Sequence, residues 1–139
     1  MISTMEIEAD LRRDEGVETH AYRCSEDKLT IGVGRNIDPR GGLGLSDTEI
    51  SFLLQNDIKR VLLELHRNFP WWSEMPDPWQ RALANMCFQL GVSRLRDFKL
   101  MLMALEAGDG EQAAHEALDS RWAQQTPERA ERIAALYRS

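Results

Sequence analysis

Residues 14–35 constrain the fold most, because they combine a helix end, a polar turn and strand-like alternation within a short stretch. Gly16 predicts the end of a helix over residues 3–15, since the residue that follows a helix commonly has a positive φ. The polar run at 25–28 separates two strand-like segments, which predicts a β-hairpin over residues 17–35. The chain is therefore expected to open with a helix and a small antiparallel sheet.

The second half of this hairpin is expected to have one apolar face and one nearly bare face. Side chains alternate along a strand, so the apolar face carries Leu29, Ile31 and Val33. The opposite face carries Thr30, Gly32 and Gly34. A glycine-lined face lets a ligand approach the backbone closely, which makes Gly32 a candidate substrate-binding position.

Glu15 is the candidate acid of this stretch. Ile7, Leu11 and Glu15 are four residues apart, so they share one face of the predicted helix. Burial of that face would raise the pKa of the Glu15 carboxyl. A protonated carboxylic acid is the group that glycosidic cleavage needs to protonate the leaving oxygen. The alternative is a solvated glutamate at a helix end, which the helix alone favours.

A motif in this stretch carries a family resemblance. Its residues are Asp14-Glu15-Gly16, Tyr22, Cys24 and Thr30-Ile31-Gly32-Val33-Gly34. They resemble the phage-type lysozyme (endolysin) family, glycoside hydrolase family 24, in which a catalytic Glu is followed by Asp or Cys and then by Thr. The resemblance implies that Glu15, Cys24 and Thr30 are catalytic. Cys24 departs from the commoner Asp, and Arg35 stands where a His often follows the Gly-x-Gly.

The remainder of the chain is predicted to be helical. Ser46 and Glu49 form a capping box, and the apolar residues that follow repeat with a helical period as far as Phe69. Later helices are expected over 77–90, 92–95, 97–107, 109–125 and from 127 onward. Phe69, Trp71 and Trp72 favour a core cluster over a sugar-stacking platform.

Two further segments match the same family. They are Asn85-Met86-x-Phe88-Gln89-x-Gly91 and Ser120-Arg121-Trp122-x-x-Gln125-Thr126-Pro127-x-Arg129-Ala130-x-Arg132. The resemblance implies that Arg129 faces the catalytic Glu15 and holds it in place. It also suggests that Gln89 hydrogen-bonds an acetamido sugar in the cleft. A surface amide and an exposed arginine on an amphipathic helix are the respective alternatives.

The predicted fold class is therefore α+β, mostly helical and lysozyme-like, with a small β-hairpin lobe and a helical lobe joined by a long helix. We expect a single domain over 1–139. Its N-terminal lobe covers about 14–45, its linking helix about 46–69 and its C-terminal lobe about 70–139, with the helix over 3–15 packing on that last lobe.

Composition limits the classes of partner. A net charge of −6 argues against a nucleic-acid-binding protein. The three histidines, His20, His66 and His115, show no metal-ligand spacing, and we expect no metal and no cofactor. The acidic N-terminus lacks an apolar core of the kind that signal peptides have, and no segment is long enough to span a membrane. We therefore expect a monomer made in the host cytoplasm that reaches the periplasmic cell wall after release, with a holin as the candidate partner.

The resemblance implies hydrolysis of the β-1,4 bond between N-acetylmuramic acid and N-acetylglucosamine in bacterial peptidoglycan, and thus host cell lysis. Glu15 would protonate the leaving oxygen, while Cys24 and Thr30 position or activate a water, with inversion at the sugar. A thiol is a weak base unless its thiolate is stabilised. The sequence leaves open whether Cys24 acts as a base, a nucleophile or a group that positions water.

Three alternatives remain at this stage. A lytic transglycosylase would also use one Glu, and a peptidoglycan-binding module would have no activity. A thiol hydrolase would pair Cys24 with His20, but residues four apart on an extended strand are about 13 Å apart.

Overall fold

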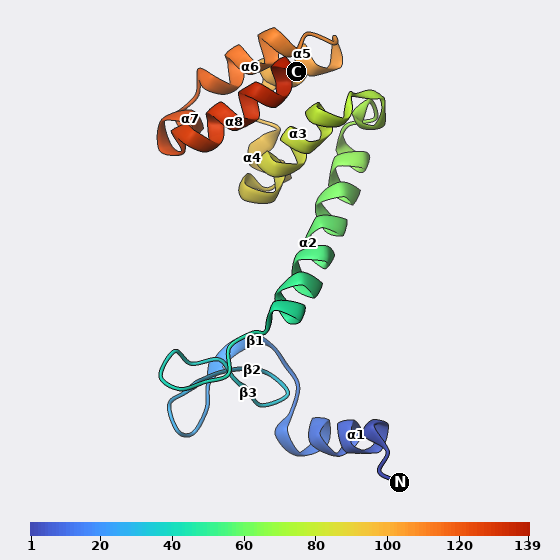
Figure 1. Cartoon of the computed structure of the whole chain (residues 1–139), viewed down its shortest axis with the longest axis vertical. Helices are drawn as coiled ribbons and strands as arrows, with labels where there is room; N and C mark the ends of the chain where they lie inside the picture. Colours follow the sequence, from blue (N-terminus) through green and yellow to red (C-terminus); the bar gives the residue numbers. More distant parts are fainter. The chain divides into compact units, whose positions relative to one another are not determined.

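The computed structural model describes residues 1–139 and divides the chain into two compact units, Met1–Phe52 and Leu53–Ser139. Each unit is described by itself (Figure 1). The first contains α1 (Thr4–Glu15), β1 (Glu18–Arg23), β2 (Leu29–Gly32), β3 (Arg35–Asn36) and the start of α2 (Asp47–Asn68). The second contains the remainder of α2, the 3₁₀ helix η1 (Trp72–Glu74), α3 (Asp77–Leu90), α4 (Val92–Leu95), α5 (Lys99–Glu106), α6 (Gly110–Leu118), α7 (Arg121–Gln125) and α8 (Pro127–Arg138).

The first helix begins and ends as the sequence predicts. The Ser3 hydroxyl accepts a hydrogen bond from the Glu6 backbone N–H at 3.3 Å, which satisfies one free donor of the first turn. At the other end Gly16 has φ +79° and donates its N–H to the Arg12 carbonyl. Glu15 is therefore the last residue of α1, immediately before the chain turns toward β1.

The sheet has three antiparallel strands in the order β1-β2-β3. The strands β1 and β2 form the predicted hairpin, whereas the short strand β3 was not predicted. We expected one strand to continue through Val33, but β2 ends at Gly32. Gly32 and Gly34 have φ of +68° and +65°, values that turn the backbone out of the extended conformation. The chain reverses there, and β3 pairs back onto β2 through Thr30 and Asn36.

The turn between β1 and β2 is a three-residue loop closed by two backbone hydrogen bonds. Asp27 donates to the Cys24 carbonyl at 2.9 Å, and Cys24 donates to the Lys28 carbonyl at 3.0 Å. Asp27 has φ +59° and is the one residue other than glycine with a positive φ. A type I turn followed by a residue in this region is a common three-residue hairpin connection.

The apolar stripe of α1 is not buried within the first unit, in contrast to the burial that the spacing predicts. Ile7 is 42% exposed and Leu11 is 46% exposed, and α1 has no buried residue. Glu15 is also exposed. The packing of the first helix on residues 70–139 stays a prediction.

Helix α2 begins with the capping box that the sequence predicts. The Ser46 hydroxyl accepts from the Glu49 N–H at 3.2 Å, and the Glu49 carboxylate accepts from the Ser46 N–H at 2.8 Å. Arg35 of β3 forms a bidentate ion pair with the same carboxylate, with Nη1–Oε1 and Nη2–Oε2 distances of 3.0 and 2.5 Å. The arginine that departs from the family pattern therefore ties the sheet to the start of α2.

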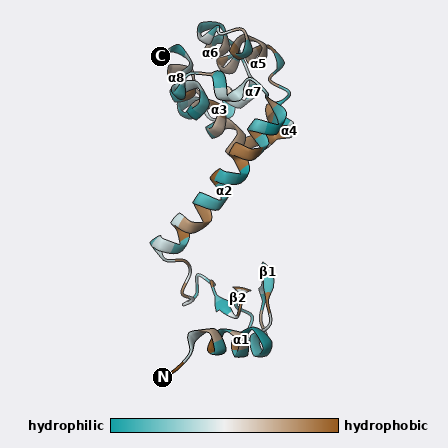
Figure 2. Ribbon diagram, turned by 90° about the vertical axis from the view of Figure 1, so that its right-hand side faces the viewer, coloured by the Kyte–Doolittle hydropathy of each residue, from teal (hydrophilic) through white to brown (hydrophobic).

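The second unit holds the apolar core of the chain. Figure 2 shows apolar residues along α2 and within the helices that follow. Phe69 and Trp72 are 6% and 3% exposed and belong to this core, which confirms the prediction of a core cluster for them. The single helix predicted over 109–125 was wrong, because α6 ends at Leu118 and the Ser120 hydroxyl caps a separate α7.

The predicted fold class is confirmed: a mostly helical α+β chain with an N-terminal antiparallel sheet, a long helix and a helical C-terminal region. The helices α6 and α8 pack together, as do α5 with α6 and α3 with α8 (Figure 1). None of the helices combines the length and the apolar character that crossing a bilayer requires.

Candidate active site

Glu15 lies against the turn between β2 and β3. A Cβ built on Gly34 would be 2.9 Å from Glu15 Oε2 and 3.3 Å from Glu15 Cδ. The carboxylate therefore occupies the space directly over the α-carbon of Gly34, which only a residue without a side chain leaves free. The structure thus brings the end of α1 onto the sheet within the first unit.

Cys24 and Thr30 are brought together on neighbouring strands. Cys24 directly follows β1, Thr30 lies in β2, and Tyr22 of β1 is the strand partner of Thr30. Thr30 is only 4% exposed, whereas Cys24 is partly exposed. The Thr30 hydroxyl donates a hydrogen bond to the Lys28 carbonyl at 2.9 Å and helps to lower the pKa of the Cys24 thiol. The sheet therefore presents a thiol to solvent above a buried hydroxyl.

The turn that follows Cys24 stabilises its thiolate. The backbone N–H of Lys28, then that of Glu26, hydrogen-bond the sulfur and hold the pKa of the Cys24 thiol below its ordinary value. The Thr30 hydroxyl acts in the same direction, while partial burial and the Glu26 carboxylate oppose it. The turn thus favours the thiolate form of Cys24.

His20 does not complete a cysteine–histidine pair. Its Nδ1 lies 2.9 Å from the Thr19 hydroxyl, and both residues are exposed on β1. No hydrogen bond joins His20 to Cys24, which is expected for residues far apart along one strand. The thiol hydrolase that the sequence left open has no base beside its thiol in this sheet.

Asp38 is a buried charged residue that the sequence alone did not single out. It is 2% exposed, and its carboxylate accepts hydrogen bonds from the backbone N–H of Leu29 at 2.9 Å and of Arg40 at 2.8 Å. The Arg40 guanidinium adds two more, at 2.9 and 3.1 Å. These bonds, led by the Arg40 side chain, lower the pKa of Asp38. An ion pair next to the strand of Thr30 therefore supports the sheet.

Gly32 keeps the open backbone that the sequence predicts. It is the strand partner of Glu18, and a Cβ built on it would have no atom within 4 Å. A ligand therefore has access to the main chain at this position. Its role in substrate binding stays a prediction.

Gln89 lies in the second unit at the end of α3 and is tied to α7. Its Oε1 accepts a hydrogen bond from the Trp122 indole N–H at 2.9 Å, while Trp122 itself is 4% exposed. The Gln89 side chain is exposed, and its amide nitrogen makes no hydrogen bond within the protein. The indole thus fixes the orientation of an amide whose two N–H donors are free for another partner.

Arg129 also lies in the second unit, near the start of α8. Its Nε donates to the Asn85 side-chain oxygen at 2.8 Å, which links α8 to α3. Both residues border a groove of about 370 Å³ whose walls are mainly apolar side chains of α2 and α3. These contacts fix the guanidinium within its own unit. Whether it faces Glu15 stays a prediction.

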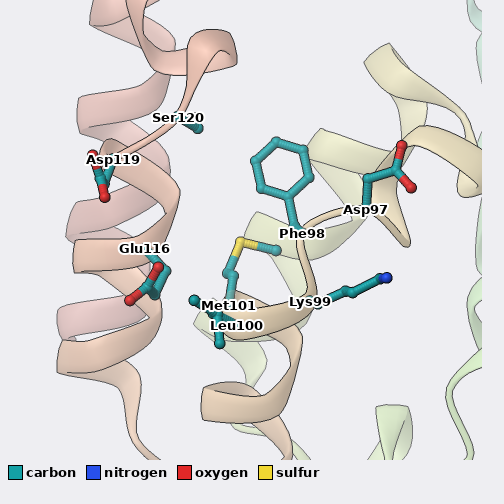
Figure 3. A pocket seen from close by; sticks show the side chains of 8 residues that line it. All are labelled: Asp97, Phe98, Lys99, Leu100, Met101, Glu116, Asp119 and Ser120. Atoms are coloured by element: carbon teal, nitrogen blue, oxygen red, sulfur yellow. The ribbon is translucent and has the colours of Figure 1, made fainter.

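Another cavity of the second unit, of about 270 Å³, contains none of the predicted site residues. Its apolar side is formed by Phe98 and Met101, and Glu116 and Asp119 lie across from them (Figure 3). The residues of the candidate site are therefore found in the sheet of the first unit and around Gln89 and Arg129, not in this cavity.

A glutamate that ends a helix beside a small sheet, followed by a long helix and a helical lobe, is the arrangement of lysozyme-like glycoside hydrolases. The model of the phage lysozyme family matches residues 12–138. The chain therefore belongs to the phage lysozyme family, which confirms the family suggested by the hairpin motif. As the members of this family are glycoside hydrolases, the expected enzyme class is confirmed as well.

The chain is similar to curated proteins from two sources. It is 32% identical to the pre-baseplate central spike protein Gp5 of Enterobacteria phage T4, over 91% of this chain and 26% of that protein. It is 29% and 24% identical to two probable T4-type lysozymes of Dictyostelium discoideum, each over 91% of this chain. Those alignments cover 90% and 89% of the relatives. The chain thus spans about a quarter of Gp5 but nearly the whole of the two lysozymes.

Proposed function

We propose that this protein is a muramidase that hydrolyses the β-1,4 bond between N-acetylmuramic acid and N-acetylglucosamine in bacterial peptidoglycan. One observation supports this most: a carboxylate lies against the glycine turn of the same small sheet that carries Cys24 at the end of β1 and Thr30 in the neighbouring strand β2. Membership of the phage lysozyme family supports the same reaction class.

In the proposed reaction Glu15 donates its proton to the glycosidic oxygen as the bond to the anomeric carbon breaks. A water attacks that carbon from the opposite face of the sugar ring, loses a proton and becomes the new hydroxyl group. Cleavage by water from the opposite face inverts the anomeric configuration. Glu15 is exposed at the end of α1, where a sugar has access to it.

Cys24 and Thr30 would hold that water and take its proton. The Thr30 hydroxyl has one proton, which it donates to the Lys28 carbonyl when Cys24 is a thiol and to the sulfur when Cys24 is a thiolate. The backbone donors around the sulfur increase the thiolate fraction and thereby its strength as an acceptor at neutral pH. We propose that this pair acts on water rather than as a covalent nucleophile.

Replacing Glu15 with Gln tests the proposal most directly. The amide has nearly the same shape but no acidic proton, so clearing of a purified cell-wall suspension should fall at least a hundredfold, the usual size of general acid catalysis. Glu8→Gln is the matched control, because Glu8 lies exposed on the same helix and pairs only with Arg12. Full clearing by the folded Glu15→Gln variant would refute the assignment.

The products separate the remaining alternatives. A muramidase leaves a free reducing end, whereas a lytic transglycosylase leaves an anhydro end that is lighter by one water, and mass spectrometry of the fragments distinguishes them. A peptidoglycan-binding module would bind the walls without releasing fragments. Proton NMR of the first products, read before the anomers equilibrate, tests the proposed inversion.

We further propose that the enzyme serves as an endolysin in host cell lysis. Family membership supports this role. The similarity to Gp5 shows, however, that a related sequence also forms part of a longer phage protein. Action in the periplasm, release by a holin and a monomeric state all stay predictions.

A further inference from the structure

The turn over residues 24–28 is closed on Cys24 by two backbone hydrogen bonds and contains the one residue other than glycine with a positive φ. Asp27 has φ +59°, the left-handed region in which glycine is the preferred residue. An aspartate tolerates this region better than most side chains but is still less suited to it than glycine. Side chains from outside the turn add to these backbone hydrogen bonds.

Two arginines from outside the turn hold it through the Asp27 carbonyl. Arg40 Nη2 donates to this oxygen at 2.5 Å, and Arg23 Nη1 makes a weaker contact at 3.5 Å. The Asp27 carboxylate is farther from Arg40 than the carbonyl is, at 4.0 Å, and lies 3.5 Å from Arg23. The guanidinium groups thus hold the main chain at the residue with the least favourable φ.

Arg40 is itself fixed by Asp38. Its Nε and Nη2 donate to the two carboxylate oxygens, and its backbone N–H donates to one of them. Asp38 is in turn anchored by the Leu29 N–H, in the residue that precedes Thr30. Because Asp38 is buried, its carboxylate depends on these donors and cannot exchange them for water.

We propose that Arg40, oriented by Asp38, is a positioning residue for the reaction: by binding the Asp27 carbonyl it holds the 24–28 turn closed on Cys24. The inference rests on the proposed function for its role in catalysis. The effect of the clamp on the Cys24 thiol is measured without any substrate.

The first test follows the pH dependence of Cys24 alkylation by iodoacetamide. Cys87 is buried at 2% exposure and is replaced by Ser throughout, so that Cys24 is the sole thiol. Arg40→Ala should move the alkylation midpoint upward by about one pH unit, because a loosened turn loses its donors to the thiolate. At neutral pH the alkylation rate should fall about tenfold.

A second substitution separates the clamp from general destabilisation. Asp27→Gly in the Arg40→Ala background gives the turn a residue that adopts positive φ freely, so the alkylation midpoint should return toward that of the parent protein. Glu49→Gln is the matched control: it breaks the Arg35 ion pair in the same unit without touching the turn, and it should leave the midpoint unchanged. Circular dichroism checks the folding of each variant.

The proposal is overturned if Arg40→Ala leaves the midpoint unchanged, or if Glu49→Gln moves it as far. If Arg40→Ala does not fold, Arg40→Lys takes its place, because lysine keeps the charge beside Asp38 but lacks the fork that joins Asp38 to Asp27. Cell-wall clearing is then measured for the same variants. A shifted midpoint in a chain that never clears cell walls would contradict the proposed function and leave the clamp standing.

Discussion

Substituting Gly34 with Ala presses a methyl group onto the Glu15 carboxylate. The new Cβ would be 2.9 Å from Oε2, 3.3 Å from Cδ and 3.4 Å from Cγ of Glu15. Ordinary contact begins near 3.4 Å, so the carboxylate oxygen must move by about 0.5 Å. The backbone at this position also has φ +65°, which strains any residue with a Cβ.

These two effects have different consequences. The strained φ should lower the free energy of unfolding by about 1–2 kcal/mol. Moving the carboxylate costs little stability, because it is the far end of a flexible, exposed side chain. It should nevertheless reduce activity: a displacement of about 1 Å at a reacting group costs on the order of a hundredfold in rate, so half of that displacement predicts about tenfold.

Gly44→Ala is the matched control for this substitution. Gly44 has φ +62°, and a Cβ built on it would meet no atom within 4 Å. It should therefore lose the same stability as Gly34→Ala in urea unfolding while clearing cell walls at the wild-type rate per folded molecule. Equal activity of the two variants would refute the argument, since the position of Glu15 over Gly34 would then have no part in catalysis.

Two further predictions concern the sheet. Cys24→Asp should keep most of the cell-wall clearing and Cys24→Ser should lose most of it, because the donors at this position suit an anion; the opposite order would indicate a role specific to sulfur. Hydrogen bonds from Arg40, then from Leu29, lower the pKa of Asp38 below its ordinary 3.8. The ionised Asp38 therefore contributes its full stabilisation of the fold above about pH 3.8, and this contribution is lost as the pH falls below that value. The difference in urea midpoint between wild type and Asp38→Asn should therefore narrow on going from about pH 5 to about pH 2, and a constant difference would contradict this reasoning.

The sequence predicted best the features that depend on neighbours within a few residues. The capping box of Ser46 and Glu49 follows from polar side chains three residues before or after a free backbone donor. The placement of Cys24 and Thr30 on neighbouring strands was also accessible, because a tight turn aligns the two strands in a fixed register. Such local rules need no knowledge of the rest of the chain.

Local patterns failed where backbone conformation overrides periodicity. Leu29, Ile31 and Val33 alternate as one strand would, yet the positive φ of Gly32 and Gly34 ends the strand early. The four-residue spacing of apolar residues across 109–125 continued through the break at Asp119, where Ser120 starts a new helix. In both cases the interrupting residue stands in the sequence, but the spacing of the apolar residues continues across it and hides the break.

Asp38 could not have been found from the sequence, because the partners that justify its burial act together only in the folded sheet. Asp38 before a proline is an ordinary turn signal. Its burial follows from Leu29, nine residues earlier, and from the Arg40 side chain folding back beside it. Close approach at Gly42 adds to this packing, since a Cβ there would be 2.6 Å from the Asp38 backbone.

The same sheet accounts for a cysteine at a position where the family more often has aspartate. A carboxylate carries its own charge at neutral pH, whereas a thiol becomes an anion only where donors stabilise it. Because the donors that lower the pKa of Cys24 belong to the backbone of the 24–28 turn, we expect them to remain when Cys24 is replaced by Asp. Changes to the clamp at Arg40 should therefore affect an aspartate variant as well, by misdirecting the donors that hold its carboxylate. Combining Arg40→Ala with Cys24→Asp tests this expectation. If the double variant clears cell walls as fast as Cys24→Asp alone, the clamp affects activity only when position 24 is a cysteine and not when it is an aspartate.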